Sequence, residues 1–379
     1  MAYTSYRVKV PGKLLIAGEY AVLEPNQQAI VVAVDRFITA YIEPSIQNQL
    51  SIPKYGLEPI TWDMGNKFIH SDQRLRFIQN SINVVNQYLQ EKSVTLRPFH
   101  LTIKSELDDH ATGKKYGLGS SAAVVVAVIS AILTLHNEGK IEPQLTHIFK
   151  LAAIAHLKTQ KSGSGVDIAA STFGGWLAYS SFNPQWVGNE LSRRKSLCKL
   201  VEKPWPNLSI TALNPPPKLK LSVGWTKESA RTAPMISKVK KYREQNQDSY
   251  THFLEKSSFA VNQMIKSFEK KDCDAAILSL TQNRKALQIL NEEAEITIET
   301  EKLESLCNCA EKFGSGKSSG AGGGDCGIAF TTGDEQLEEL HKAWQKEGIV
   351  PLRLSVSKLG VFVTEYNCEM PLVDYVMSV

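Results

Sequence analysis

The sequence predicts an α+β protein of two domains. The chain has 379 residues, which is more than one compact core usually holds. Strand-like and helix-like segments are mixed in it without the strict alternation that builds a parallel sheet. A proline-rich segment, NPPPKLK at residues 214–220, makes a suitable spacer between two folding units. We therefore predict a first domain over residues 1–215 and a second over residues 216–379.

The first predicted domain begins with strands. Residues 6–23 and 29–44 consist of short β-branched and apolar runs interrupted by proline or glycine, which is typical of strands. Residues 74–91 have apolar positions at helical spacing, whereas residues 99–107 return to alternation. The remaining segments of this domain are a helix beginning near 122, a helix over 145–160, a Gly/Ser turn at 161–165 and the apolar segment 166–182.

The second predicted domain is charged and rich in helix from about residue 235 to residue 313. A glycine cluster, GSGKSSGAGGGD, then leads into the strand-like segment CGIAFTT at 326–332. A helix over 334–348 follows, and a strand pair at 350–358 and 360–366 completes the prediction.

Composition, net charge and cysteine spacing argue against several classes of protein. The chain is 42% hydrophobic and 22% charged, and its formal charge of +4 is too small to predict a general nucleic-acid binder. The opening segment MAYTSYRVKVPGK lacks the apolar stretch of a signal peptide. The six cysteines show no CxxC spacing, so we expect reduced thiols rather than zinc ligands or disulfides. These features predict a cytoplasmic protein with neither nucleic-acid nor membrane partners.

One motif places polar, flexible residues directly before an apolar run. KKYGLGSSAA, at residues 114–123, leads into apolar residues 122–135, a run shorter than the ~20 residues of a membrane span. A core helix with an open first turn explains the arrangement, because the free N–H groups of such a turn bind anions. We expect Ser120 or Ser121 to cap the helix and leave the other hydroxyl for a phosphate or a magnesium ion. The two lysines supply positive charge.

Two common phosphate-binding motifs fit less well. GSGKSS resembles the end of a P-loop, but that motif requires glycine at the position of Glu311. GLGSSA satisfies the dinucleotide fingerprint, yet the polar segment DDHATGKK precedes it where a buried strand is needed. A nicotinamide-dependent enzyme is therefore a disfavoured alternative.

Two further segments are difficult to explain by packing alone. Lys13 stands between apolar residues on a predicted strand, where its ammonium must reach solvent or find an anionic partner. SSGAGGGDCGIAF, at residues 318–330, joins a glycine cluster directly to an apolar strand. This arrangement favours a backbone surface for a bound anion over a flexible linker.

In this order, PGKLLIAGEYAVL, KKYGLGSSAAVVV and SSGAGGGDCGIAF resemble the three motifs of the GHMP kinase family, named for its galactokinase, homoserine, mevalonate and phosphomevalonate kinase members. STFGGWLAYSSF and VGWTKESA are most similar to members from Gram-positive bacteria that phosphorylate 5-phosphomevalonate. The resemblance implies a domain like ribosomal protein S5 domain 2, then a ferredoxin-like domain. ATP and the acceptor would meet in the cleft between them.

The resemblance also implies roles for individual residues. Lys13 and Asp167 match the active-site lysine and the catalytic aspartate, and Ser121 matches a serine that reaches the Mg²⁺ bound with ATP. The residues expected around the ATP phosphates are Lys114, Gly117, Leu118, Gly119, Ser120, Ser121 and Ala122. Those expected at the acceptor are Glu19, Tyr20, Ser162, Ser164, Gly165, Lys227, Ser319, Gly320 and Ala321. Additional candidate cations are Lys9, Arg193, Arg194 and Arg231.

One position departs from the family pattern. Relatives often carry a magnesium-binding glutamate on the helix before the catalytic aspartate, and His156 stands at the matching position. Magnesium prefers oxygen ligands, so we expect His156 to be a packed or surface residue of the helix.

The implied acceptor determines what the two catalytic residues must do. A phosphate monoester has a second pKa of about 6, so 5-phosphomevalonate already offers an anionic oxygen and requires no general base. We expect Lys13 to bridge the acceptor and the γ-phosphate, and Asp167 to hold Lys13 in place. The product would be 5-diphosphomevalonate, in the mevalonate pathway to isoprenoids. Alternatives are mevalonate kinase or another family kinase that acts on a hydroxyl, and a non-catalytic, ligand-sensing homologue.

Overall fold

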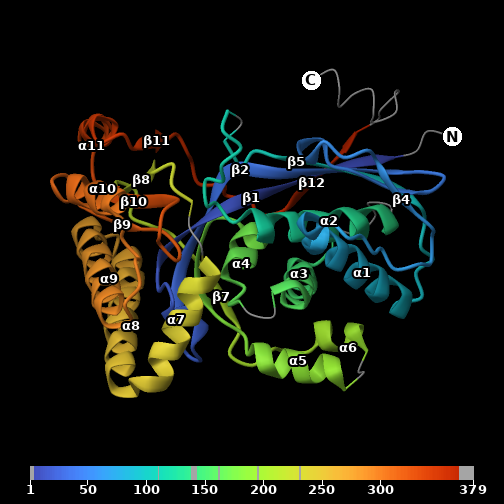
Figure 1. Ribbon diagram of the computed structural model, residues 1–379, viewed down its shortest axis with the longest axis horizontal. Helices are drawn as coiled ribbons and strands as arrows, with labels where there is room; N and C mark the ends of the chain where they lie inside the picture. The colour runs from blue at the N-terminus through green and yellow to red at the C-terminus, as the bar shows by residue number, and fades with distance from the viewer. Residues whose placement is uncertain are drawn as a thin grey trace.

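The computed structural model describes residues 4–109, 111–137, 143–160, 163–193, 196–229 and 232–366. Helices and strands form two units, each built on its own sheet (Figure 1). The predicted class, a two-domain α+β fold, is confirmed. No helix within these ranges is long and apolar enough to cross a membrane.

The first sheet is built on a long antiparallel pair, β1 (Ser5–Ala17) and β2 (Gln28–Pro44). The pairing shifts register between Pro11 and Gly12 and again between Leu15 and Ala17, so β1 bends just before and just after Lys13. The other strands of this sheet are β3 (Asn48–Ser51), β4 (Ile60–Trp62), β5 (Phe99–Ser105), β6 (Trp176–Ser180), β7 (Ser209–Leu213) and β12 (Phe362–Tyr366).

Helices cover one face of this sheet (Figure 1). The central one, α2 (Ser120–His136), is buried from Ala122 to His136 except at Val124, because β1 and β2 lie on one side of it and other helices on the other. This burial explains the apolar run of the sequence, since a helix that is apolar all round needs cover on all sides. The other helices of the first unit are α1 (Arg76–Glu91), α3 (Leu145–Gln160), α4 (Val166–Phe173), α5 (Pro184–Ser192) and α6 (Leu197–Glu202), with short 3₁₀ turns η1 (Ala21–Leu23), η2 (Pro53–Tyr55) and η3 (Gln73–Leu75).

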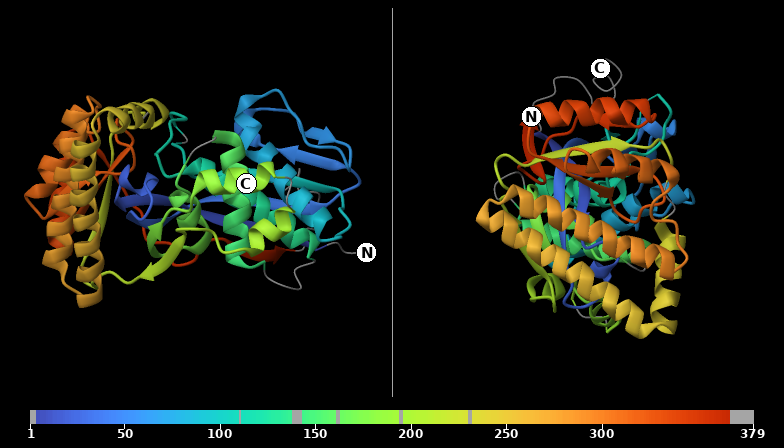
Figure 2. Two further views of the ribbon diagram at one scale, coloured as in Figure 1. Left: turned by 90° about the horizontal axis from the view of Figure 1, so that it is seen from below. Right: turned by 90° about the vertical axis from the view of Figure 1, so that its left-hand side faces the viewer.

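The second sheet is antiparallel, with the order β11-β8-β10-β9. In chain order this is 4-1-3-2 with helices in the two crossovers, which is the ferredoxin-like arrangement. The long helices α8 and α9 run side by side at the end of the molecule (Figure 2). The strands are β8 (Lys220–Trp225), β9 (Ser315–Ser318), β10 (Cys326–Thr331) and β11 (Val350–Leu352), and the helices are α7 (Thr232–Gln245), α8 (Gln247–Lys270), α9 (Cys273–Glu293), α10 (Glu301–Glu311) and α11 (Asp334–Lys346).

The end of the chain differs from the prediction. Residues 350–358 and 360–366 were expected to pair, but β11 pairs with β8 while β12 returns to the first sheet and pairs with β1. The predicted boundary at residue 215 falls between β7 and β8, which belong to different sheets. The first sheet therefore also includes a strand from the predicted second domain. The strand β9 lies inside the glycine cluster and was not predicted, because its sequence, SGKS, carries no strand pattern.

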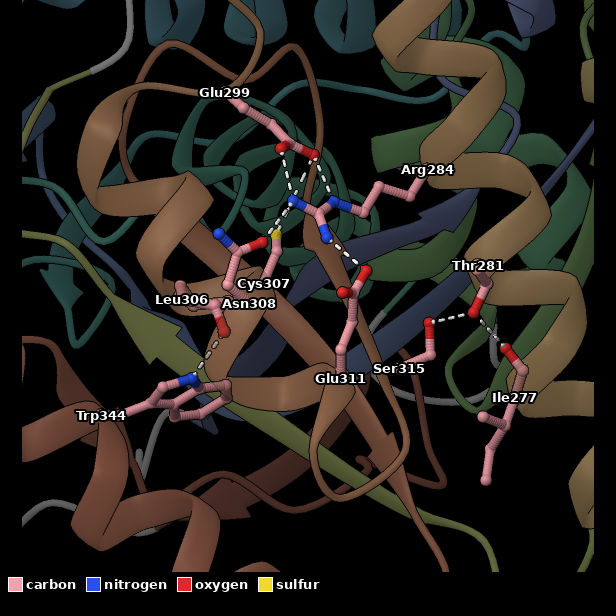
Figure 3. A network of polar contacts seen from close by, with 10 residues as sticks. All are labelled: Ile277, Thr281, Arg284, Glu299, Leu306, Cys307, Asn308, Glu311, Ser315 and Trp344. Carbon is pink, nitrogen blue, oxygen red and sulfur yellow. Dashed lines mark hydrogen bonds and ion pairs between the residues drawn. The ribbon is translucent and has the colours of Figure 1, made fainter.

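A buried arginine fastens the helices of the second unit together. The guanidinium of Arg284 on α9 is 4% exposed and makes two hydrogen bonds of 2.9 Å to the carboxylate of Glu299. It also donates to Glu311 at 2.5 Å and to Asn308 at 3.2 Å, both on α10 (Figure 3). Nearby, the hydroxyl of Thr281 donates to Ser315 of β9 at 2.8 Å. These contacts fix α9, α10 and β9, and so fix the glycine loop that follows β9.

Replacing Arg284 with methionine is expected to lower the free energy of unfolding by about 3–5 kcal/mol, because it leaves the carboxylate of Glu299, whose side chain is only 12% exposed, without its buried counter-charge. Urea denaturation followed by circular dichroism measures the change. Lys285→Met is the matched control, since Lys285 is the next residue of the same helix and is exposed. A loss below about 1 kcal/mol for Arg284→Met would contradict this interpretation of the network.

Candidate active site

Lys13 is buried at the centre of the molecule and is paired with a carboxylate. Its strand is covered on both faces beyond Pro11, so Lys13 is only 7% exposed. The ammonium nitrogen lies 3.4 Å from Oδ1 of Asp167. Its own backbone N–H donates to the carbonyl of Leu118 at 2.9 Å, which ties β1 to the loop before α2. The structure therefore brings together the two residues that the sequence proposed for catalysis.

Asp167 owes its position to the start of α4. It lies in the first turn of that helix, where the helix dipole favours a negative charge. Gly165, with φ of 80°, precedes the helix, and a Cβ atom there would lie 2.8 Å from the ring of Phe182. The carbonyl of Ser164 accepts hydrogen bonds from the hydroxyls of Tyr179 and Ser181. These two hydrogen bonds hold the loop before Asp167 in place.

The mouth of α2 is more open than predicted. The residue before the helix is Gly119, with φ of 77°, and no side chain caps the first turn. The expectation that Ser120 or Ser121 caps the helix is therefore wrong, because both serines lie within the helix, one residue or more beyond the capping position. A Cβ atom at Gly119 would lie 2.9 Å from Cγ and Cε of Lys13. Glycine at this position allows the lysine side chain to pass directly against the helix mouth.

The third motif contacts the first, and these contacts join the two units. The loop between β9 and β10 is joined to β1 by Ser319, whose hydroxyl donates to the carbonyl of Leu15 at 2.9 Å. The hydroxyl of Tyr20 donates to the carbonyl of Ala321 at 2.5 Å. The second motif also contacts the third, because Gly117 lies so close to Asp325 that a Cβ atom added to the glycine would be 2.6 Å from Cβ of Asp325. All three motifs consequently meet around Lys13.

A second buried ion pair also joins the two units. Lys317 of β9, 0% exposed, bonds to the carboxylate of Glu19, which is 1% exposed, and to the carbonyl of Ser318 at 2.5 Å. Charges buried so deeply are tolerated only as pairs. In the sequence, Lys317 stands only in the segment GSGKSS, whose spacing does not match a P-loop, so no signal there pointed to a partner for it.

Three residues at this junction have backbone angles that are rare outside glycine. They are Tyr20, Lys227 and Asp325, with φ of 60°, 62° and 57°. Such strain gathers where the surrounding structure imposes it, often at functional sites. Burial raises the pKa of the Tyr20 hydroxyl, and the nearby charge of Glu19 raises it further. This hydroxyl therefore stays protonated as the donor to Ala321.

The residues just described line a cavity between the two units, which we call the interdomain cavity. Eight of the predicted residues line it: Lys13, Glu19, Tyr20, Ser164, Gly165, Asp167, Gly320 and Ala321. The walls also include His156 and Gln160 from α3 and Ile236 from α7. Ser319 and Lys227 are not among its lining residues, and the carbonyl of Lys227 instead accepts a hydrogen bond from Lys114 at 3.1 Å. The predicted residue Ser162 lies outside the described residues.

A second cavity opens at the start of α2, and we call it the helix-mouth cavity. Ser120 and Ser121 line it on one side. The guanidinium of Arg74 lies 4.7 Å from the ring centre of Tyr55 on its wall. The rest of its lining is Ile38, Ile52, Lys54, Gln73, Phe77, Ile78, Ile103, Ser105, Asp108, Lys115 and Val124. Apolar and aromatic side chains thus stand beside polar and charged ones, a lining that suits a flat aromatic ligand with a charged substituent.

Sequence reasoning missed this second cavity altogether. Its apolar residues come from separate strands, 3₁₀ turns and helices, and each is an ordinary core residue in its own segment.

Of the additional cations, Lys9 lies 5.3 Å from the ring centre of Phe37, and Arg193 pairs with Glu190 at 3.5 Å. Neither lines a cavity described above, and Arg194 and Arg231 lie outside the described residues.

Comparison with known proteins identifies the family of the chain. The family model described as the GHMP kinases N terminal domain matches residues 77–175, and the one described as GHMP kinases C terminal matches residues 264–350. The phosphomevalonate kinase of Streptomyces sp. strain CL190 is 33% identical over 371 residues, which cover 93% of this chain and 97% of that protein.

Two solved structures extend the similarity to the fold. The Lin0012 protein of Listeria innocua is 40% identical with a TM-score of 0.90, and the match covers 95% of this chain and 99% of that one. Phosphomevalonate kinase of Streptococcus pneumoniae, solved with phosphomevalonate and AMPPNP, is 31% identical with a TM-score of 0.81 and coverage of 92% and 99%. With its three motifs gathered around a buried lysine, the chain belongs to the GHMP kinase family and is one of that family's ATP-dependent kinases.

Proposed function

We propose that this kinase transfers the γ-phosphoryl group of ATP to the phosphate of 5-phosphomevalonate, giving 5-diphosphomevalonate and ADP. The observation that carries the proposal is the buried ammonium of Lys13, which is paired with Asp167, lines the interdomain cavity and belongs to a side chain that passes against Gly119 at the mouth of α2. The similarity to phosphomevalonate kinases over nearly the whole chain supports the choice of acceptor.

The helix-mouth cavity is the proposed nucleotide site. Its apolar walls would take the base, and the uncapped N–H groups of α2, with the hydroxyls of Ser120 and Ser121, would take the phosphates. Lys114 and Lys115 add positive charge at the same loop. The proposed product, ADP, would leave by the same opening.

The donor groups present fit a magnesium ion that arrives with ATP. The described residues hold no group of three or more His, Cys, Asp or Glu side chains that would bind a metal by themselves. Magnesium commonly keeps its waters and binds through substrate phosphates with few protein ligands. The hydroxyl of Ser121, part-exposed at the helix mouth, is the protein ligand that we propose. The bound ion would neutralise phosphate charge.

The interdomain cavity is the proposed acceptor site. A phosphate acceptor is already a nucleophile, so the main obstacle to reaction is the repulsion between two anions. Lys13 is buried, and water screens a buried charge less than an exposed one. Its ammonium therefore reduces that repulsion more strongly than an exposed lysine would. Asp167 fixes the direction of the ammonium at 3.4 Å. Ser164, Gly165, Gly320 and Ala321 would surround the acceptor.

One observation favours a second candidate, mevalonate kinase. The side chain of Asp167 is 37% exposed, so its carboxylate is accessible to an acceptor hydroxyl that needs a general base. The same cavity would then hold mevalonate in place of its phosphate ester.

Turnover with the two acceptors decides between the candidates. ADP release is measured with Mg-ATP and either 5-phosphomevalonate or mevalonate, and we expect turnover with the phosphorylated acceptor. Preferred turnover of mevalonate would refute the proposed acceptor. Binding of ATP without turnover of either compound would indicate a ligand-sensing homologue.

A further inference from the structure

One titratable side chain in the interdomain cavity has no use in the scheme above. Lys13 is paired with Asp167, Glu19 with Lys317, and the hydroxyl of Tyr20 with Ala321. The imidazole of His156 makes no hydrogen bond within the described part of the chain, although it lines the cavity. As expected from the sequence, His156 is a packed residue of its helix, and its ring in addition lines the cavity.

His156 stands at the wall between the two cavities. Its ring packs against Phe77 of α1 with 5.0 Å between ring centres, and Phe77 lines the helix-mouth cavity. On the other side, Gly163 leaves room beside the ring, since even a Cβ atom there would lie 3.8 Å from Nδ1. In the function proposed above, the phosphoryl group passes from the helix-mouth cavity to the interdomain cavity, and His156 lies where these two cavities adjoin.

The electrostatics suit a neutral donor at this position. Burial lowers the pKa of His156, and the negative charge of Asp167 opposes that effect only in part. The lowered pKa favours the neutral ring, which offers one N–H donor. Among the described residues that line the cavity, Lys13 carries the one positive charge, while Asp167 and Glu19 are negative. A phosphate oxygen here therefore gains from every additional N–H donor.

We propose that His156 is a substrate-contacting residue that donates an N–H to a phosphate oxygen at the point where the phosphoryl group passes between the cavities. The inference rests on the proposed function and extends it. The packing against Phe77 sets the plane of the ring, and the ring lines the cavity that is proposed to hold the acceptor.

Two substitutions separate hydrogen bonding from packing. His156→Phe keeps an aromatic ring against Phe77 and removes the donor, whereas His156→Gln keeps an N–H donor. We expect the phenylalanine variant to lose about ten- to a hundred-fold in kcat, the effect of one hydrogen bond to a charged group. We expect the glutamine variant to stay within about threefold of the wild type, the difference between similar donors.

The matched control is His147→Gln, a half-buried histidine on the same helix that lines neither cavity and lies 3.5 Å from the hydroxyl of Tyr88. It should leave kcat unchanged. Undiminished turnover in His156→Phe, or equal losses in the phenylalanine and glutamine variants, would overturn the proposal.

A measurement on the wild-type protein covers the case in which His156→Phe fails to fold. The chain has eight histidines, so selective ¹⁵N-histidine labelling gives a tractable NMR spectrum, and His156→Gln assigns the signal. Addition of Mg-AMPPNP with 5-phosphomevalonate should shift the ring nitrogens of His156, and an unshifted signal would overturn the inference. If the wild type prefers mevalonate, the proposed acceptor is wrong, and the same variants and spectra are measured with mevalonate.

Discussion

Lys13→Met is expected to lower kcat by about a thousand-fold or more, because a cation that stabilises the transition state of phosphoryl transfer contributes roughly 10³–10⁵ in rate. Methionine matches the length and apolar stem of lysine, so it fills the space against Gly119 without the charge. The two anions would then approach in a site where, within the part of the chain that the structure describes, no other lining residue of the interdomain cavity is cationic. Steady-state ADP release with saturating substrates measures the loss.

The control is Lys9→Met on the same strand. Lys9 lies over the ring of Phe37 and lines neither of the two cavities, so its removal should change kcat less than about threefold, as is usual for a surface substitution. Thermal melts establish that both variants fold, and a shift of the melting temperature by AMPPNP establishes that the nucleotide still binds. Full turnover by a folded Lys13→Met variant would refute both the site and the mechanism.

Asp167→Asn is expected to lower kcat by about a hundred-fold, the effect of a small misplacement of a catalytic group. The amide has the shape of the carboxylate but not its charge, so the ammonium of Lys13 loses the partner that fixes it at 3.4 Å. The phosphate of the proposed acceptor, 5-phosphomevalonate, has a second pKa of about 6, so with this acceptor the acidic limb of the pH–rate profile would belong to the substrate. Activity should therefore still rise with pH through this range in the variant.

The pH–rate profile distinguishes positioning from base catalysis. A general base at Asp167 would contribute its own acidic limb to the profile, and the asparagine variant would lose that limb while it still binds both substrates. That result would show that Asp167 accepts a proton, and it would favour a hydroxyl acceptor. The profile is recorded with each acceptor, and Asp167→Ala serves to show how much of the loss follows from the shape of the side chain.

The sequence predicted the regular elements well where their pattern is local. Residues 145–160 carry helical spacing and form α3 over the same range, and the β-branched runs near the start form β1 and β2. The prediction failed where long-range contacts decide. The segment SGKS has no strand pattern and becomes β9 because it pairs with β10, and β12 leaves β11 for the distant β1. Gly119 precedes α2 without a cap, and sequence rules for capping favour the serines that follow it.

The amino-acid sequence by itself determined which chemical groups are available to the site. These are the glycine-rich loops, a lysine between apolar residues at position 13, and the aspartate after a Gly/Ser turn. These depend on residue type and near neighbours, which a local motif records. Only the tertiary structure decided which groups meet. It joined Lys13 to Asp167, joined Glu19 to Lys317 across the two units, gathered the helix-mouth cavity from scattered core residues, and placed His156 at the wall between the cavities. The physical reason is that charge pairing and cavity shape depend on distances through space, which packing of the whole chain sets.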